Sequence, residues 1–423
     1  MNNSAQQLLF GEEVAASGPP RQRSSLTFKA NLTLGRHGWL RLTPAYSRHL
    51  VKELVVPLSK RDRVLDPFCG TGTTALTCAE HGIRADTVDI NPFLVWLANA
   101  KFAAYGPVQI AEARMFSASL HLADTGENLW HPPLHDIEKW WHRRDLHALS
   151  ALFAAIRQAE VSQPARNLLL LAFCRVAIET AAVSFGHQSM SFKPHDGELD
   201  MVDIHGSVNM QGLFSRRLFE ILEAAKVPID GSLAAAHVGD SRCLQEVLSG
   251  KYTQVITSPP YPNRISYIRE LRPYMYWLGY LSDGRQAGEL DWQAIGGTWG
   301  CATSNLTHWQ PDPAKAVPFD GFLEMIGRIA QRSRILSQYV YKYFEDCVLH
   351  FRSLVRVLAK RAVVHYIVGN SKFYDVIVPT ELIYAALLRE HGFRDVTVEN
   401  IRKRNSKKEL FEFVVSGVFD PKR

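Results

Sequence analysis

The sequence predicts an α/β protein whose mostly parallel sheet is interrupted by a mostly helical insert. The first observation is a strand–turn–helix–strand pattern over residues 64–90, which is typical of the opening half of a doubly wound sheet. The second is that residues 94 to about 228 carry several helical stretches and almost no strand pattern. The third is the return of strand patterns from residue 235 onward. Strands and helices that alternate around inserts indicate one α/β domain with accessory segments.

The opening unit has clear boundaries. Val64-Leu65-Asp66 predicts a short strand that runs into a glycine-rich turn, and Thr73–Ala79 predicts a helix that stops near Gly82. Residues 83–90 predict the second strand. Before the unit, residues 45–58 have apolar side chains at helical spacing.

The rest of the chain predicts further elements in order. Residues 168–182, within the insert, predict a strongly apolar helix that should be buried. Residues 283–318 are rich in Gly, Trp, Pro and Asp and predict an irregular stretch. The remaining predicted elements are strands at 235–240, 254–257 and 361–368, one or two long helices over 319–359, a helix at 378–391, and a closing hairpin of 396–402 and 410–419.

Composition and charge narrow the class of protein. Of the 423 residues, 46% are hydrophobic and 21% are charged, a globular balance that predicts a sizeable core. No apolar run is long enough to span a bilayer, and residues 1–25 predict a disordered leader without a signal-peptide core, so we expect a cytoplasmic protein. The six cysteines form no CxxC pair, which argues against a zinc site or a disulfide framework. The net charge of +6 is compatible with a polyanionic partner without demonstrating one.

The turn after the first strand consists of Asp66-Pro67-Phe68-Cys69-Gly70-Thr71-Gly72. Glycines at the carboxyl end of a strand let the backbone turn tightly and approach a ligand closely. The turn lacks both the G-x-G-x-x-G of a dinucleotide site and the G-K-[ST] of a phosphate-binding loop, and its carboxylate would repel phosphate. It therefore predicts a site for a cationic or amine-bearing ligand.

Two further aspartates follow the next predicted strands. Asp89 is placed to accept hydrogen bonds from ribose hydroxyls, and Asp240 from an adenine amino group. Three carboxylates at neighbouring strand ends fit S-adenosylmethionine, which carries an amino acid, a ribose and a base. The alternative for each aspartate is a helix cap or a turn residue, and for Asp240, which precedes Ser241, that alternative stays open.

The segment Thr257-Ser258-Pro259-Pro260-Tyr261 follows another predicted strand, about 190 residues after the glycine-rich turn. Consecutive prolines rigidify the backbone and remove two donors, so we expect their carbonyls to be free to accept. Ser258 adds an acceptor, and two acceptors would hold both hydrogens of a base's exocyclic amine and turn its lone pair toward an electrophilic methyl group. Tyr261 offers a flat face to a base that has left the helix. The alternative is a proline-rich turn with a buried tyrosine.

At these two motifs the chain resembles the DNA amino-methyltransferases, which use S-adenosylmethionine to methylate exocyclic amines. D-P-F-C-G-T-G is similar to their cofactor motif and T-S-P-P-Y to their catalytic motif, in the form typical of cytosine-N4 rather than adenine-N6 enzymes. Residues 43–47, 363–371 and 402–413 extend the resemblance to roughly half the chain. It implies a Rossmann-like seven-stranded methyltransferase sheet, mostly parallel with a C-terminal antiparallel hairpin.

The resemblance also implies roles for individual residues. Ser258 and the carbonyl of Pro259 would orient the target amine, and Tyr261 would stack on the base. Transfer would be direct and in line. No covalent cysteine step is expected, because Pro260 stands where a cytosine-C5 enzyme has its nucleophile, and no metal is expected. The cofactor would be held by Tyr46, Asp66, Phe68, Cys69, Gly70, Thr71, Gly72, Asp89, Ile90, Asp240 and Ser241.

The motifs divide the chain into segments. We expect a first core segment at 26–102, a helical insert at 103–232 as the first candidate for DNA recognition, and a second core segment at 233–423 that includes an irregular insert at 283–345. Ala359-Lys360-Arg361 departs from the family's usual Pro-Gly-Gly. The candidate DNA contacts, for which solvated surface charge is the alternative, are Arg264, Lys193, Arg402, Lys403 and Arg404.

We therefore expect a bacterial or archaeal enzyme that flips and methylates cytosine at N4 in duplex DNA, site-specifically, beside a cognate restriction endonuclease. An adenine-N6 DNA enzyme stays an alternative. Ser258 is the only sequence feature that argues against it. An RNA amino-methyltransferase would often carry a separate RNA-binding module, and none is evident. A silent DNA-binding subunit has no reason to keep both motifs intact. A monomer and a dimer both remain open.

Overall fold

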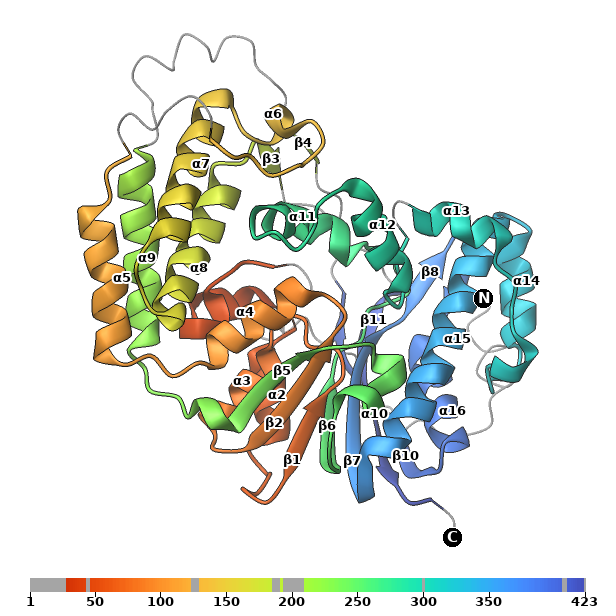
Figure 1. The fold of residues 1–423 in the computed structure, drawn as a ribbon. Coiled ribbons are helices and arrows are strands. Elements are labelled where there is room, and N and C mark those ends of the chain that lie inside the picture. The colour runs from red at the N-terminus through yellow and green to blue at the C-terminus, as the bar shows by residue number, and fades with distance from the viewer. Residues whose placement is uncertain are drawn as a thin grey trace.

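The computed structural model describes residues 28–42, 46–122, 129–184, 191–192, 209–298, 301–404 and 409–421. Its centre is a seven-stranded sheet with the order β10-β11-β7-β6-β1-β2-β5 (Figure 1). The strands from β7 to β5 pair in parallel, whereas β11 is antiparallel to both β7 and β10. This confirms the predicted Rossmann-like α/β sheet. The strands are β1 (Arg63–Asp66), β2 (Arg84–Asp89), β5 (Ala234–Val238), β6 (Tyr252–Thr257), β7 (Leu358–Gly369), β10 (Phe393–Lys403) and β11 (Phe411–Phe419).

The predicted strand–turn–helix–strand unit is present. β1 leads through the glycine-rich turn into α3 (Thr73–Glu80), and Gly82, with a φ of 72°, lets the chain turn into β2. β1 and β2 pair with Leu65 opposite Asp86. The helix expected at 45–58 is α2 (Arg48–Val55), which packs on α3, and α4 (Pro92–Phe102) follows β2.

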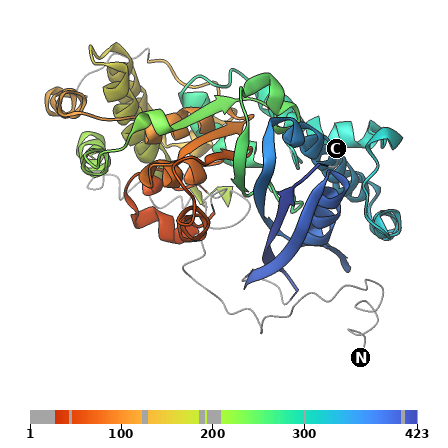
Figure 2. The same ribbon diagram turned by 90° about the horizontal axis from the view of Figure 1, so that it is seen from below.

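The insert is helical, as expected, and its buried side chains pack together with those of the core. Its helices stand above and beside β5 in Figure 1, and Figure 2 shows them gathered at one end of the molecule. Buried side chains of the insert form one cluster with Phe93 of α4 and Trp277 of α11 (Tyr267–Trp277). The insert elements are α5 (Pro107–Ser119), α6 (Ile137–Trp140), α7 (Arg143–Gln158), α8 (Gln163–Glu179), the pair β3 (Val183–Ser184) and β4 (Ser191–Phe192), and α9 (Met210–Ala225).

The second half of the chain holds the helices that cover the β7 side of the sheet. The stretch predicted as one or two long helices at 319–359 contains the shorter α14 and the long α15, and α16 matches the predicted helix at 378–391. The strand pair β8 (Ser371–Phe373) and β9 (Val376–Val378) was not predicted. The helices are α10 (Leu244–Val247), α12 (Gly284–Gln293), α13 (Cys301–His308), α14 (Phe322–Ala330), α15 (Arg334–Val357) and α16 (Thr380–Glu390), with short 3-10 turns at η2 (Phe28–Thr33), η3 (Gly35–Gly38), η5 (Gly231–Leu233), η6 (Ser241–Cys243) and η7 (Pro313–Lys315).

The prediction of an irregular stretch at 283–318 was wrong, because α12 and α13 lie in it. Asp283 caps α12 by accepting from the backbone N–H of Gln286 at 2.8 Å. The fully buried side chains of the helix, such as Ala287 and Asp291, are small or polar, and its apolar Leu290 and Trp292 are only partly buried, so its apolar pattern is weak. Among the described residues, no helix is both long and apolar enough to cross a membrane.

Arg36 joins the insert to the first core segment. Its buried guanidinium donates to the carbonyl oxygens of Lys101 and Ala103 at the end of α4 and to those of Ala225 and Val227 at the end of α9, at 2.5–3.1 Å. One side chain therefore donates hydrogen bonds to four carbonyl oxygens at or just after the C-terminal ends of two helices.

Replacement of Arg36 by Met should destabilise the fold by about 3 kcal/mol, because several buried carbonyls lose their donor while the apolar stem is kept. Urea unfolding monitored by circular dichroism measures this change. The matched control is Arg41→Met, since Arg41 is exposed and should change the free energy of unfolding by less than about 0.5 kcal/mol. Equal stability of the two variants would contradict the role of Arg36.

Candidate functional site

The two sequence motifs meet at the carboxyl ends of adjacent strands. β1 and β6 pair in parallel, so the glycine-rich turn and the S-P-P-Y segment leave the sheet side by side. The Thr257 hydroxyl donates to Asp66 Oδ1 at 2.6 Å, which joins the last residue of β6 to the last residue of β1. Segments about 190 residues apart in the sequence thus form one site.

The glycine-rich turn is held by contacts from three directions. Gly70 and Gly72 have φ angles of 51° and 75°, and a Cβ on Gly72 would lie 3.0 Å from the Ala98 Cβ of α4. The Cys69 N–H donates to the Val88 carbonyl at 2.8 Å. The Nζ of buried Lys101 donates to the Thr71 carbonyl at 2.9 Å, and burial lowers the pKa of Lys101 to about 8.

Asp66 carries a buried carboxylate oxygen without a hydrogen-bond partner among the described residues. Its carboxyl is buried, and Oδ1 accepts from Thr257 and from the Phe68 N–H, whereas Oδ2 has no hydrogen-bond partner. Burial raises the pKa of Asp66 to about 7, and the nearby Thr257 and Thr74 hydroxyls and the Phe68 N–H oppose this only in part. A buried carboxylate oxygen without a partner is a ready acceptor for a cationic donor.

Asp89 stabilises the glycine-rich turn through hydrogen bonds, and its carboxylate can accept further hydrogen bonds. Oδ2 accepts from the Gly70 N–H and Oδ1 from the Asn91 N–H, both at 2.9 Å. Each carboxylate oxygen can accept a second hydrogen bond. Burial raises the pKa of Asp89 to about 6, although the residue retains some solvent exposure, as does the following Ile90. The fold thus brings Asp89 to the predicted position and gives it a structural contact that the sequence did not suggest.

Asp240 shows the capping geometry that the sequence left open. It accepts from the Arg242 N–H at 2.8 Å at the start of η6, and its Oδ2 lies 2.6 Å from Nη2 of Arg242. Arg242 also binds Asp346 of α15 at 2.7 Å. Asp240 is therefore a helix cap and an ion-pair partner, and a ligand would have to share its oxygens.

Phe68 and Ser241 both contact the buried His350 of α15. The Phe68 and His350 rings are 4.9 Å apart, Nδ1 of His350 donates to the Ser241 carbonyl at 3.1 Å, and Nε2 accepts from the Tyr366 hydroxyl at 2.7 Å. Burial lowers the pKa of His350 to about 4, so the ring is neutral at neutral pH. His350 and Tyr366 orient two predicted cofactor residues, and nothing in their local sequence indicates this.

Tyr46 lies between α3 and the chain before α2. Its hydroxyl shares a short hydrogen bond with the Thr74 hydroxyl, and its carbonyl accepts from the Asn31 side chain at 2.8 Å. Burial raises its pKa well above the usual range, so the hydroxyl stays protonated. The three residues before it in the predicted motif, at 43–45, lie outside the described residues.

The S-P-P-Y segment differs in one respect from expectation. The Pro260 carbonyl is not free, because it accepts from the Tyr343 hydroxyl of α15 at 2.7 Å. Among the described contacts none occupies the Pro259 carbonyl, and Ser258 Oγ makes one long contact of 3.4 Å with the Tyr261 hydroxyl. Ser258 and Pro259 are therefore the acceptors of this segment without a hydrogen bond shorter than 3.4 Å among the described contacts.

The Tyr261 ring packs against the end of β7. A Cβ on Gly369 would lie 3.0 Å from Cδ2 of Tyr261, so a larger residue there would push the ring away by a few tenths of an ångström. The Arg404 guanidinium lies 5.5 Å from the ring centroid and donates to the Asn370 carbonyl at 3.2 Å. The structure thus brings Arg404, predicted as a DNA contact, beside the S-P-P-Y segment.

The other predicted DNA contacts are in different settings. Arg264 is exposed three residues after Tyr261, with a φ of 63°. Arg402 forms an ion pair with Glu412 at 2.5 Å, which neutralises it within the hairpin, and Lys403 follows it in β10. Lys193 lies outside the described residues.

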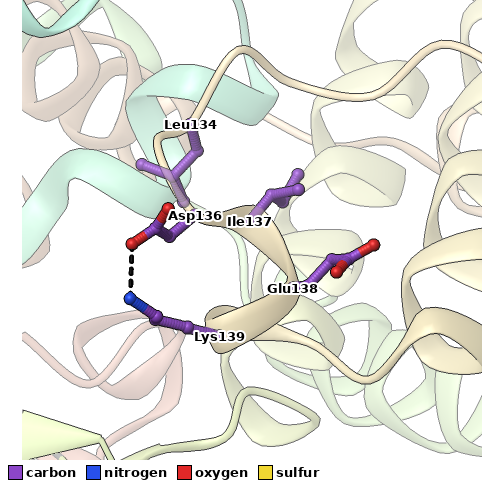
Figure 3. A pocket seen from close by; sticks show the side chains of 5 residues that line it. All are labelled: Leu134, Asp136, Ile137, Glu138 and Lys139. Atoms are coloured by element: carbon purple, nitrogen blue, oxygen red, sulfur yellow. Dashed lines mark hydrogen bonds and ion pairs between the residues drawn. The ribbon is translucent and has the colours of Figure 1, made fainter.

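A surface pocket occurs elsewhere, on the insert. Leu134 and Ile137 line it together with Asp136, Glu138 and Lys139, and Asp136 and Lys139 form an ion pair at 2.5 Å (Figure 3). It is shallow and solvent-exposed and contains none of the motif residues. Within the described ranges no three His, Cys, Asp or Glu side chains are grouped to hold a metal ion.

The chain is similar over nearly its whole length to two methyltransferases. It is 21% identical to the Type II methyltransferase M.BsoBI of Geobacillus stearothermophilus, over 92% of this chain and 85% of that protein. It is 22% identical to the Type II methyltransferase M.AvaI of Nostoc sp., over 92% of this chain and 86% of that protein. No family model matches the chain.

Among solved structures, the rRNA methyltransferase AviRa of Streptomyces viridochromogenes aligns with 94% of this chain and 94% of its own, at 12% identity and a TM-score of 0.30. That score is too low for the likeness to bear on fold or substrate.

Proposed function

We propose that this protein is a DNA methyltransferase that transfers a methyl group from S-adenosylmethionine to N4 of cytosine, at a specific site in duplex DNA. The observation that carries the proposal is the meeting of the D-P-F-C-G-T-G turn and the S-P-P-Y segment at adjacent strand ends. The extended similarity to two Type II methyltransferases supports the same activity. Such an enzyme would act beside a restriction endonuclease of matching specificity.

The residues of the glycine-rich turn fit the cofactor. The unpartnered oxygen of Asp66 suits the α-ammonium group, and the spare acceptor sites of Asp89 suit two ribose hydroxyls. Phe68 and Ser241 form an ordered wall that suits the adenine. When bound, S-adenosylmethionine supplies the electrophilic methyl group.

The acceptor segment fits an exocyclic amine. Since the Pro260 carbonyl is turned toward Tyr343, Ser258 Oγ and the Pro259 carbonyl are the two acceptors that suit the two amine hydrogens. Holding both hydrogens aims the nitrogen lone pair away from the acceptors, toward the cofactor side of the site. The protein contribution is then positioning and electrostatics, with no covalent intermediate on the chain.

Recognition of DNA is part of the same proposal. A base in a duplex must leave the helix to reach strand ends that are recessed among side chains. We assign sequence recognition to the insert at 103–232 and backbone contacts to the two arginines nearest the catalytic segment, Arg264 and Arg404.

Label transfer tests the substrate class. The full chain is incubated with isotopically labelled S-adenosylmethionine and either mixed-sequence duplex DNA or total RNA, and acid-insoluble label is counted. We expect label in DNA and less than about one hundredth of it in RNA. Label only in RNA would replace DNA as the substrate, and cofactor binding without label in either would favour a silent DNA-binding subunit.

Cofactor affinity should depend on pH through Asp66. Its pKa is raised to about 7, so below pH 7 the free carboxyl is increasingly protonated and loses its attraction for the ammonium group. The affinity should therefore fall by up to about tenfold per pH unit as pH drops below about 7. Asp89, with a pKa raised to about 6, would steepen the fall below pH 6. Calorimetric titration of S-adenosylmethionine between pH 5.5 and 7.5 measures this, and a constant dissociation constant would contradict it.

A further inference from the structure

Two tyrosines of α15 hold the segment that carries the acceptor groups. The Tyr343 hydroxyl donates to the Pro260 carbonyl at 2.7 Å, and the Tyr339 hydroxyl accepts from the Arg264 N–H at 3.3 Å. The two tyrosines are four residues apart, so they lie on the same face of the helix. One helix therefore contacts the loop that contains the acceptor segment at two points, at Pro260 within the segment and at Arg264 just after it.

The two tyrosines are themselves fixed by packing and hydrogen bonds. Tyr343 is 1% exposed, its ring packs edge-on to Phe344 at 4.9 Å, and its hydroxyl lies 3.1 Å from that of Tyr384. Tyr339 is 3% exposed and donates to the Gly296 carbonyl at 3.4 Å. Burial raises the pKa of both hydroxyls, so they stay protonated at any working pH. They are permanent, well-directed partners of the segment.

The segment needs such partners, because its backbone is strained. Arg264 has a φ of 63°, a conformation that residues other than glycine adopt only when their surroundings impose it. Upstream, consecutive prolines fix the φ angles, so the direction of one carbonyl limits the direction of its neighbour. A contact at Pro260 is thereby transmitted to Pro259 and Ser258.

We propose that Tyr343 and Tyr339 are positioning residues that fix the acceptor segment so that Ser258 Oγ and the Pro259 carbonyl, and not the Pro260 carbonyl, receive the target amine. The inference rests on the proposed function for its consequence in catalysis, but the clamp itself is a property of the unliganded protein. The hydrogen bond from Tyr343 turns the Pro260 carbonyl toward α15 and leaves it one lone pair, which makes it a weaker competitor for the amine. Neither tyrosine is assigned a contact with cofactor or substrate.

The test uses Tyr343→Phe and Tyr339→Phe, each of which removes one hydroxyl and keeps the ring. The matched control is Tyr341→Phe, because Tyr341 is on the same helix and packs on Trp309 and Phe322 instead of the acceptor segment. Hydrogen exchange over residues 261–266 should be at least about tenfold faster in both test variants and unchanged in the control. Unchanged exchange in the test variants would overturn the proposal whatever their activity.

Single-turnover methylation gives the second readout. Tyr343→Phe should lower the transfer rate by about ten- to a hundredfold, since a misplacement of about 1 Å costs that much, while the dissociation constants for cofactor and DNA stay within about twofold. A lower melting temperature with an unchanged transfer rate would show a merely structural role and overturn the proposal. A wild-type protein that shows the exchange difference but methylates nothing would instead contradict the proposed function and leave the clamp intact.

Discussion

Replacement of Ser258 by Ala is expected to reduce methyl transfer to DNA by about a hundredfold or more and to leave cofactor affinity within about twofold of the wild-type value. Ser258 Oγ makes only a long contact with Tyr261, so its loss removes no strong structural bond. With the Pro260 carbonyl turned toward Tyr343, the variant keeps the Pro259 carbonyl but loses the second acceptor that we assign to the amine. The amine would then rotate, and its lone pair would no longer point at the methyl group.

The variant is assayed by single-turnover transfer and by calorimetric titration of S-adenosylmethionine. The matched control is Ser59→Ala, since Ser59 is an exposed serine before β1, at the opposite end of that strand from the site, and it bonds to the nearby Asp62 carboxylate at 2.9 Å. It should transfer at the wild-type rate. Full activity in Ser258→Ala would remove the S-P-P-Y segment from the acceptor site.

Replacement of Asp66 by Asn is expected to weaken S-adenosylmethionine binding by about 10- to 100-fold at pH 7.5, the range for loss of a charge-assisted hydrogen bond. Asparagine has nearly the same shape, and its amide oxygen can still accept the Thr257 hydroxyl that closes β1 against β6. The variant lacks the negative charge. Its cofactor affinity should therefore no longer fall as the pH drops from 7.5 toward 6.5.

Unlike the affinity for the cofactor, the free energy of unfolding of the unliganded protein should not decrease in Asp66→Asn. Because burial raises the pKa of Asp66 in the folded state, ionisation of this group opposes folding increasingly as pH rises from about 4 through about 7. The unliganded Asn variant escapes this effect and should be at least as stable as the wild type at pH 8. The matched control is Asp420→Asn, which alters an ion pair with Arg394 in the remote hairpin and should leave cofactor binding unchanged. Wild-type affinity and pH dependence in Asp66→Asn would show that the cofactor's ammonium group binds elsewhere.

The parts of the fold that the sequence predicted are those in which local patterns coincide with tertiary structure. β1, α3 and β2 are short, are bounded by glycines and bury apolar side chains, so their pattern survives in the sheet. α12 was missed because its fully buried side chains are small or polar, with Asp291 buried against Ser266. The position of β11 between β7 and β10 depends on long-range pairing, which a hairpin pattern does not contain.

The candidate site likewise contains residues that the sequence predicted and residues that it did not. Both motifs were identifiable because glycine, proline and carboxylate each limit what a backbone or a ligand can do at their position. The residues that fix them, Lys101, Tyr343 and His350, lie in ordinary helical stretches and act only through contacts made on folding. Asp240 is instructive, since the cap and the ligand role need the same geometry, and the structure shows the cap.

We propose that the protein methylates the exocyclic amine of a base in DNA at the joined ends of β1 and β6. One measurement tests this most directly. The full chain and Ser258→Ala are incubated with mixed-sequence duplex DNA and labelled S-adenosylmethionine, and the DNA is digested to nucleosides for mass spectrometry. We expect labelled N4-methylcytosine with the wild type and little or none with the variant. Labelled N6-methyladenine would keep the site and change the base, whereas label on a ring carbon of cytosine, or equal labelling by the variant, would contradict the account.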